Sequence, residues 1–268
     1  MIIIGEKING TRKSIARAIA DKDHDFIGDL ALRQVKAGAD YLDINAGTHP
    51  DTEPEDMVWL INVVQEVTDV PLCLDSANPE AMAAGLGVVK TTPILNSLSG
   101  EKKRLEGVLP LAREHGAGLI VLTMDDDGIP NSVEKRLEIA QTLVNKIREA
   151  GLPDKNLYID PLVTTLATDQ ESGKRAFETM RLIKEQFPEV HLTAGLSNIS
   201  FGLPNRSIIN QAFAALAIAA GLDSAIINPE DPELRGLIYA AEAVLGMDQY
   251  CMNYLRAFRA GLIGKSEG

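Results

Sequence analysis

Short apolar runs recur along the 268-residue chain, and each is followed by a polar loop and an amphipathic stretch. This alternation is typical of parallel βα units, and runs that are apolar at every position are typical of strands buried on both faces. The pattern predicts eight strands, at residues 2–6, 40–45, 71–75, 93–96, 118–124, 156–160, 191–195 and 224–227.

Helix signals lie between these runs. One helix is predicted from apolar residues that share a face: Val133, Leu137, Ala140, Val144 and Ile147. Asn131 with Glu134 predicts its capped start, and Gly151 its end. Further helix starts are predicted just after strands, at Thr52 with Glu55, Asn78-Pro79 and Asp231-Pro232.

Eight βα units account for the whole chain, without a low-complexity linker or a break in composition. We therefore expect an α/β protein with a single (β/α)8 TIM barrel, and one domain over residues 1–268. The main alternative is an open, doubly wound sheet. It is less favoured because no GxGxxG motif follows the first strand.

Composition limits the classes of partner. A formal charge of -12 and 4% aromatic residues provide neither a basic surface for phosphates nor many rings for stacking bases. We expect no nucleic-acid partner. The apolar start Met1 to Ile4 is interrupted at once by Gly5 and Glu6, and no later run is long enough to span a bilayer. We therefore expect no membrane association and a cytoplasmic location.

Cysteine and histidine give little sign of a metal site. Cys73 and Cys251 are far apart and form no CxxC motif, and Cys73 lies between two leucines as a small buried residue would. The histidines lack HExxH spacing, so we interpret His24, His49, His115 and His191 as solvated or structural. We expect no bound metal.

The candidate chemistry lies at the strand ends, which meet at one face of a barrel. Most of these positions carry a carboxylate, an amide or a hydroxyl: Glu6, Asn9, Asp43, Asn45, Asp75, Asn96, Thr123, Asp160, Ser197, Asn198 and Asn228. Such residues often cap helices or form turns. However, Asp75, Asn96 and Asp160 complete apolar strands several residues before the next helix, where they are badly placed to cap it.

Buried carboxylates need hydrogen-bonded or cationic partners, so this ring suits a neutral heterocycle rich in N–H donors, such as a pterin. A sugar is an alternative, although no strand end provides an aromatic ring for stacking. A second alternative is a divalent cation bound by Asp43, Asp75 and Asp160.

The strand-end motifs resemble the folate-dependent corrinoid methyltransferases. They are EKING at 6–10, LDINAG at 42–47, LCLDS at 72–76, LNS at 95–97, LTM at 122–124, YIDPL at 158–162, and GLSN with NR between 195 and 206. The similarity covers essentially the whole chain, in order. It is closest to stand-alone enzymes that move a methyl group between tetrahydrofolate and the cobalt of a separate corrinoid protein. The chain is more distantly similar to the folate barrel of cobalamin-dependent methionine synthase and to dihydropteroate synthase.

The resemblance implies roles for particular residues. Asp75, Asn96 and Asp160 would hold the pterin edge, Gly195 would let the backbone approach closely, and Ser197 would line the pocket. Catalysis would involve Asn198 at the nitrogen that carries the methyl group, linked to Asp160 through water. The other expected folate-binding residues are Glu6, Asn9, Asp43, Asn45 and Arg206. For Arg206, bracing of the loop and contact with the folate tail both remain open.

The resemblance also implies tetrahydrofolate or methyltetrahydrofolate as substrate, a homodimer, and a corrinoid (cobalamin) carried by a partner protein. The chain itself has no DxHxxG corrinoid-binding signature. The direction of transfer stays open. Asp125, Asp126 and Asp127 are more acidic than the family pattern. Two interpretations stay open, namely a solvated turn and a surface that influences the choice of partner.

Three other functions are considered. A dihydropteroate synthase should carry basic residues in the loop after its seventh strand, for the diphosphate, and at the end of its eighth strand. This chain has Ser197-Asn198 and Asn228-Pro229 at these places. A Schiff-base aldolase needs a lysine in the pocket, and Lys7 is predicted to be ion-paired because Glu6 and Asn9 are near it. The third is an inactive folate-binding subunit that only scaffolds a corrinoid complex.

Overall fold

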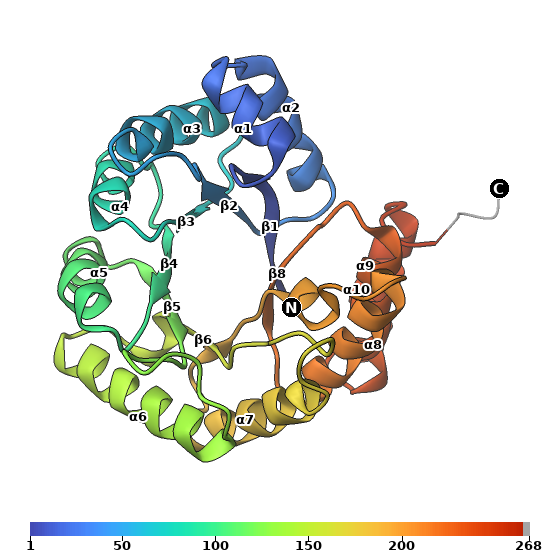
Figure 1. The fold of residues 1–268 in the computed structure, drawn as a ribbon. Helices are drawn as coiled ribbons and strands as arrows, with labels where there is room; N and C mark the ends of the chain where they lie inside the picture. Colours follow the sequence, from blue (N-terminus) through green and yellow to red (C-terminus); the bar gives the residue numbers. More distant parts are fainter. Residues whose placement is uncertain (265–268) are drawn as a thin grey trace.

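The computed structural model describes residues 1–264 of the chain. Eight parallel strands form one sheet in the order β7-β6-β5-β4-β3-β2-β1-β8, which curves into a barrel (Figure 1). The strands are β1 (Ile2–Asn9), β2 (Tyr41–Asn45), β3 (Leu72–Asp75), β4 (Ile94–Leu98), β5 (Gly118–Leu122), β6 (Leu157–Asp160), β7 (His191–Leu192) and β8 (Ser224–Ile227). The predicted (β/α)8 barrel is confirmed. The predicted domain also included residues 265–268, which lie outside the described part.

Helices surround the strands (Figure 1). They are α1 (Lys13–Ala20), α2 (His24–Lys36), α3 (Glu53–Val67), α4 (Pro79–Leu86), α5 (Lys102–His115), α6 (Val133–Glu149), α7 (Ser172–Gln186), α8 (Arg206–Ala219), α9 (Pro232–Val244) and α10 (Met252–Arg259), with 3-10 turns η1 (Asp154–Asn156), η2 (Leu196–Ser200) and η3 (Gln249–Cys251). Among residues 1–264, none of these helices combines the length and the apolar character needed to cross a membrane. The cytoplasmic location stays a prediction.

All eight predicted strands are present, with differences at their ends. Strand β7 has only two residues because the chain leaves the sheet after Leu192 and enters η2. Strand β1 extends to Asn9, and its register with β2 shifts between Gly5 and Ile8. The amide of Lys7, at this bulge, donates to the side chain of buried Gln34 (3.0 Å). The bulge thus sets the direction of the residues that follow it.

Few hydrogen bonds join β7 and β8, the two strands that close the barrel. Gly195 and Ile226 form an isolated parallel bridge. The amide of Ile226 donates to the Ala194 carbonyl (3.0 Å), and the amide of Leu192 donates to the side chain of Asp223 (2.8 Å). This junction is more sparsely bonded than the paired strands elsewhere.

Two apolar layers support the site. One large core lies between the strands and the helices. A smaller cluster is made of Ile4, Cys73, Ile94, Ile120 and Tyr158. Side chains two apart on a strand share a face, so Cys73, Ile94 and Tyr158 lie one layer below Asp75, Asn96 and Asp160 of β3, β4 and β6. Cys73 is fully buried, as predicted.

Helix starts follow the sequence in part. The side chains of Asn78 and Asp231 cap α4 and α9 as predicted. The predicted capping box at Thr52 is wrong, because the Thr52 hydroxyl donates to the His49 carbonyl (3.2 Å) instead of bonding the helix.

The predicted cap of α6 at Asn131 is also wrong by one residue. Ser132 is in an extended conformation, and its hydroxyl accepts a hydrogen bond from the amide of Lys135 (3.2 Å). At the other end, Gly151 adopts a left-handed φ of 91°, and its amide bonds the Arg148 carbonyl (2.9 Å), as a helix end requires.

Candidate functional site

The strand register brings the predicted polar residues side by side. Asp75 at the end of β3 is paired with Asn96 of β4, and Asn9 of β1 with Asn45 of β2. Asp160 ends β6 next to Leu122 of β5. Parallel strands place all their carboxyl ends at the same rim of a barrel. The peptide bond between Asn96 and Ser97 is cis.

Amide side chains bond two of the carboxylates. The Nδ2 atom of Asn45 donates to Asp75 Oδ2 (2.8 Å), and Nδ2 of Asn96 lies 3.3 Å from Asp43 Oδ1. Asp43 is almost fully buried. These bonds form two pairs, and the register of Asp75 with Asn96 places the pairs side by side, as the sequence predicted for neighbouring strand ends.

Burial dominates the ionisation of this group. It raises the pKa of Asp43 well above its ordinary value, and the neighbouring charge of Asp75 raises it further. Burial also raises the pKa of Asp75, while the hydrogen bond from Asn45 and the positive charge of Arg104 oppose that rise. Two adjacent buried carboxyl groups thus favour one shared negative charge, which suits a ligand that offers N–H donors.

Asp160 lies apart from this group and has its own partners. Its Oδ1 accepts a hydrogen bond from the amide of Leu162 (2.7 Å), whose φ of 62° is left-handed. Burial raises the pKa of Asp160 to about 6, against the opposing effects of that bond and of Arg136. Asp160 is therefore mostly ionised at neutral pH but close enough to its pKa to exchange a proton.

The turn η2 carries the residues predicted at the reactive side. Asn198 is exposed, and its backbone amide donates to the Gly195 carbonyl (3.1 Å). A Cβ atom on Gly195 would lie 3.1 Å from the Asn198 side-chain nitrogen, so glycine leaves room for this amide. Across residues 1–264, no direct hydrogen bond joins Asn198 to Asp160. Their predicted link through water stays a prediction.

Arg206 braces the loop between η2 and α8. Its Nε donates to the Ser200 hydroxyl (3.0 Å), and its Nη2 donates to the Ser197 carbonyl (2.7 Å). Asn205, just before it, is left-handed with φ of 47°. The structure therefore gives Arg206 the bracing role, while its contact with a folate tail stays a prediction.

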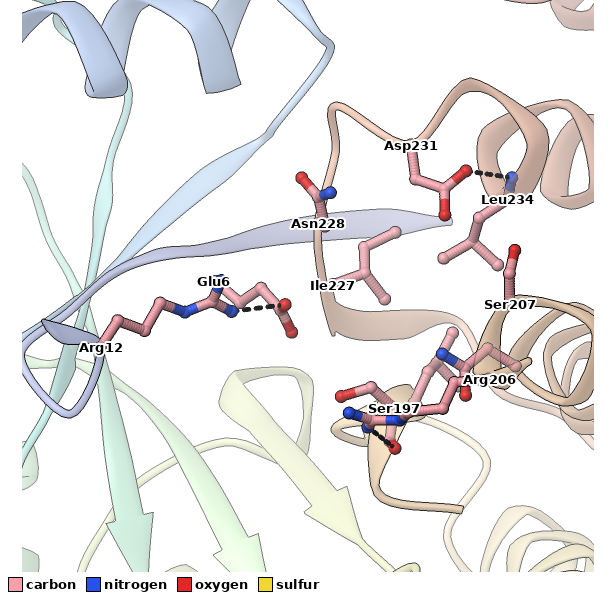
Figure 2. A pocket seen from close by; sticks show the side chains of 11 residues that line it. Glu6, Arg12, Ser197, Arg206, Ser207, Ile227, Asn228, Asp231 and Leu234 are labelled. Atoms are coloured by element: carbon pink, nitrogen blue, oxygen red, sulfur yellow. Dashed lines mark hydrogen bonds and ion pairs between the residues drawn. The ribbon is translucent and has the colours of Figure 1, made fainter. Parts of the chain in front are cut away.

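A pocket of about 430 Å³ opens beside the polar ring. Figure 2 shows Glu6 and Arg12 on one side of it, and Ser197 and Arg206 on the other. The remaining lining residues are Leu196, Ser207, Asn210, Ile227, Asn228, Asp231 and Leu234. This pocket includes the predicted residues Glu6, Ser197 and Arg206.

The charge partners of β1 differ from the simplest interpretation of the sequence. Lys7 is ion-paired, as predicted, but with Glu230 (3.9 Å) and not with its neighbour Glu6. Glu6 instead pairs with Arg12 (2.8 Å). Lys7 is therefore paired with a residue distant in sequence, and Glu6 with a residue in the loop that follows its own strand.

Several buried polar atoms near the strand ends have no hydrogen-bond partner within residues 1–264. They are Asn45 Oδ1, Thr48 Oγ1 and Thr123 Oγ1. A buried polar atom without a partner is costly, so such atoms fit a ligand that supplies several hydrogen bonds. In the same residues, no group of three or more His, Cys, Asp or Glu side chains is arranged to hold a metal ion. The alternative cation site at Asp43, Asp75 and Asp160 is therefore not assembled.

Comparison with known proteins agrees with this geometry. The family model described as pterin binding enzyme matches residues 5–228. The chain belongs to the pterin binding enzyme family. This pterin binding enzyme is 41% identical over 266 residues to the methylcorrinoid:tetrahydrofolate methyltransferase of Eubacterium limosum, covering 98% of both chains. It is 33% identical over 241 residues to the methionine synthase of Mycobacterium tuberculosis, covering 85% of this chain and 20% of that protein.

Solved structures support the fold of this pterin binding enzyme. Yersinia pestis DHPS with a pterine-sulfa conjugate superposes with a TM-score of 0.68 at 18% identity, covering 91% of this chain and 94% of that one. Dihydropteroate synthase from Xanthomonas albilineans with 7,8-dihydropteroate gives 0.68 at 19% identity, covering 91% and 93%. At such identities these structures support the barrel fold alone.

The sequence did not point to the residues that hold this rim from outside. Arg104 Nη1 donates to the Ser76 carbonyl (2.9 Å), and the Ser76 hydroxyl donates to buried Glu53 (2.7 Å). Arg136 bonds the carbonyls of Pro161 and Leu162. The only sequence signal was the position of Arg136, four residues before Ala140 on the apolar face of its helix.

Proposed function

We propose that this pterin binding enzyme is a methyltransferase that moves a methyl group between tetrahydrofolate and the cobalt of a corrinoid carried by a separate protein. The observation that carries the proposal is the rim itself, where half-buried Asp75, Asn96 and Asp160 lie at neighbouring strand ends with buried Asp43. Polar atoms of Asn45, Thr48 and Thr123 in the same region have no hydrogen-bond partner among residues 1–264. The relative from Eubacterium limosum, similar along almost its whole length, supports the same activity.

In this proposal the rim binds the pterin edge. Asp75 and Asp160 accept N–H bonds from the amino and amide groups of the ring, and Asn96 adds an amide. Asn45 and Leu162 already occupy one oxygen of Asp75 and Asp160 respectively, which orients each carboxylate before folate arrives. Such preorganisation reduces the entropy lost on binding. In this proposal the same residues bind the pterin ring of tetrahydrofolate and that of methyltetrahydrofolate.

Asn198 is the proposed group at the reactive nitrogen. In either direction that nitrogen bears positive charge while its bond to the methyl carbon is made or broken. The exposed side chain of Asn198 offers a donor and an acceptor to it. Asp160, with a pKa of about 6, provides a proton donor or acceptor through water. A single well-placed polar group of this kind contributes about 10² to 10³ in rate.

The name of the relative from Eubacterium limosum runs from methylcorrinoid to tetrahydrofolate, and we propose the same direction for this chain. The corrinoid protein would dock over the barrel rim. Asp125, Asp126 and Asp127 form a turn there, in which the Asp127 amide donates to Asp125 Oδ1 (3.1 Å). We propose that this acidic turn influences which corrinoid protein docks.

We also propose a homodimer, which would use the outer face of α8 and α9. An apolar groove of about 340 Å³ lies between these helices, lined by Ala215, Ala219, Leu237, Ala240, Ala241, Val244 and Leu245. Val244, which lines the groove, is 87% exposed, and Leu216 of α8 is 55% exposed. Exposed apolar residues around an apolar groove are typical of an interface.

The deciding experiment is calorimetric binding of tetrahydrofolate and methyltetrahydrofolate, followed by spectroscopic methyl transfer with free cobalamin in both directions. We expect Asp160→Asn to bind folate weakly, and Asn198→Ala to retain binding while its rate falls by about 10² to 10³. Binding without turnover in wild type would favour the inactive scaffold. A wild type that binds no folate would contradict the proposal, and a dihydropteroate synthase assay would then be the next test.

A further inference from the structure

Arg136 is the largest fully buried side chain, and its charge lies beneath the rim. Its Nε donates to the Pro130 carbonyl (2.9 Å), and its Nη1 donates to the carbonyls of Pro161 (2.7 Å) and Leu162 (2.9 Å). Within residues 1–264 no carboxylate forms an ion pair with it, and its Nη2 has no partner. Burying a guanidinium without an ion pair is costly, so this placement requires a reason.

The contacts of Arg136 lead directly to Asp160. Leu162, whose carbonyl Arg136 holds, donates its amide to Asp160 Oδ1 (2.7 Å). Leu162 has a left-handed backbone with φ of 62°, which a leucine rarely adopts unless its surroundings fix it. Arg136 bonds the carbonyls on both sides of this amide. It therefore fixes the turn that sets the direction of the Asp160 carboxylate.

The charge of Arg136, like its hydrogen bonds, acts on Asp160. The positive charge of Arg136 opposes the rise in the pKa of Asp160 that burial causes. The other charged groups near Arg136 are Arg175 of α7 and Asp169 of the preceding loop, and these two pair with each other. The charge of Arg136 is thus left facing Asp160 without a competing ion pair of its own.

We propose that Arg136 is a positioning residue for pterin recognition, which holds the Pro161-Leu162 turn so that Asp160 presents one oxygen to Leu162 and the other to the pterin edge. This inference rests on the proposed folate-binding function. It separates two roles at the rim, because Asp160 contacts the ligand while Arg136 acts through Asp160 only.

A double-mutant cycle tests the inference. Methyltetrahydrofolate binding is measured by calorimetry for wild type, Arg136→Lys, Asp160→Asn and the double variant. Lysine keeps the charge but cannot bond several carbonyls in the same fixed geometry. We expect Arg136→Lys to weaken binding about 10-fold when Asp160 is present, and less than about 3-fold in the Asp160→Asn background. An equal loss in both backgrounds, or no loss, overturns the inference.

Arg235 provides a matched control. It is also buried, and it donates only to backbone carbonyls, including that of Pro229 after β8. Arg235→Lys should change folate affinity by less than about 3-fold, with no difference between the two Asp160 backgrounds. If Arg235→Lys shows the same coupling as Arg136→Lys, the effect is general loosening of the barrel and the inference fails.

A second measurement needs no folate. The pKa of Asp160 is determined by carboxyl-carbon NMR in the ligand-free protein, for wild type and for Arg136→Met. We expect a higher pKa in the variant, because the opposing charge is gone; an unchanged pKa overturns the electrostatic part. If Arg136→Met does not fold, Arg136→Lys still provides the cycle. A wild type that binds no folate contradicts the proposed function itself, which this NMR result distinguishes from failure of the inference.

Discussion

Asp160 illustrates how a buried ionisable residue destabilises the protein that carries it. Its pKa is about 6 in the folded chain, above the ordinary value of 3.8 for an aspartate, so the folded state binds the proton more tightly than the unfolded state. Stability from this group is therefore present at low pH and is lost as pH rises from about 4 to about 6. Above about pH 6, the buried charge of Asp160 lowers the free energy of unfolding by its full amount.

We therefore predict that Asp160→Asn stabilises the ligand-free protein at pH 7 by up to about 3 kcal/mol, at about 1.4 kcal/mol per pKa unit. Asparagine can still accept the bond from Leu162, but it carries no charge. Urea unfolding at several pH values measures the effect. The gain should shrink as pH falls from 7 to 4, and a gain independent of pH would contradict this explanation.

At this scale the sequence predicted the residues of the rim but not those that hold it. Asp75, Asn96 and Asp160 are visible because a polar residue ends an apolar strand, which is a local pattern. Arg104 and Arg136 act on carbonyls of other βα units, namely Ser76, Pro161 and Leu162. Every residue has a backbone carbonyl, so the sequence does not indicate which carbonyl accepts a bond, and only the fold reveals these contacts.

At the scale of elements, helix α6 matters because it carries Arg136 to the rim. Its start is set by Ser132, whose hydroxyl accepts from the amide of Lys135, whereas Asn131 makes no such bond. We predict that Ser132→Ala lowers the free energy of unfolding by about 1 kcal/mol, as expected for loss of a cap. Asn131→Ala, one residue away, serves as the control with little change. The reverse order in denaturant unfolding would restore the capping interpretation made from sequence.

Strand positions were more predictable than helix caps. All eight apolar runs became strands, because burial on both faces requires apolar residues at every position. The start of α6 moved from Asn131 to Ser132, and Thr52 bonds His49 instead of capping α3. Several adjacent residues are able to cap a helix, and the choice depends on the direction from which the loop arrives.

At the scale of the whole molecule, the exposed apolar face of α8 and α9 determines assembly in our proposal. We predict that Val244→Lys converts the homodimer to a monomer, because it places a charge on a residue that is 87% exposed in the single chain. Analytical ultracentrifugation measures the result. Ile129→Lys, an exposed apolar residue on the loop between β5 and α6, is the control and should leave the dimer intact. A monomeric wild type would contradict the proposed homodimer.

The sparse junction between β7 and β8 has a consequence for motion. Few bonds join these strands, and η2 with Asn198 follows directly after β7. Segments with few protecting contacts open at a small free-energy cost. In deuterated water, the amide of Ile226 at this junction should exchange before that of Ile44 in the fully paired β2, and bound folate should slow the exchange near η2. In the proposed function, Asn198 follows a strand junction that few hydrogen bonds hold, so its side chain can move with the reactive nitrogen when methylation changes the shape of that nitrogen.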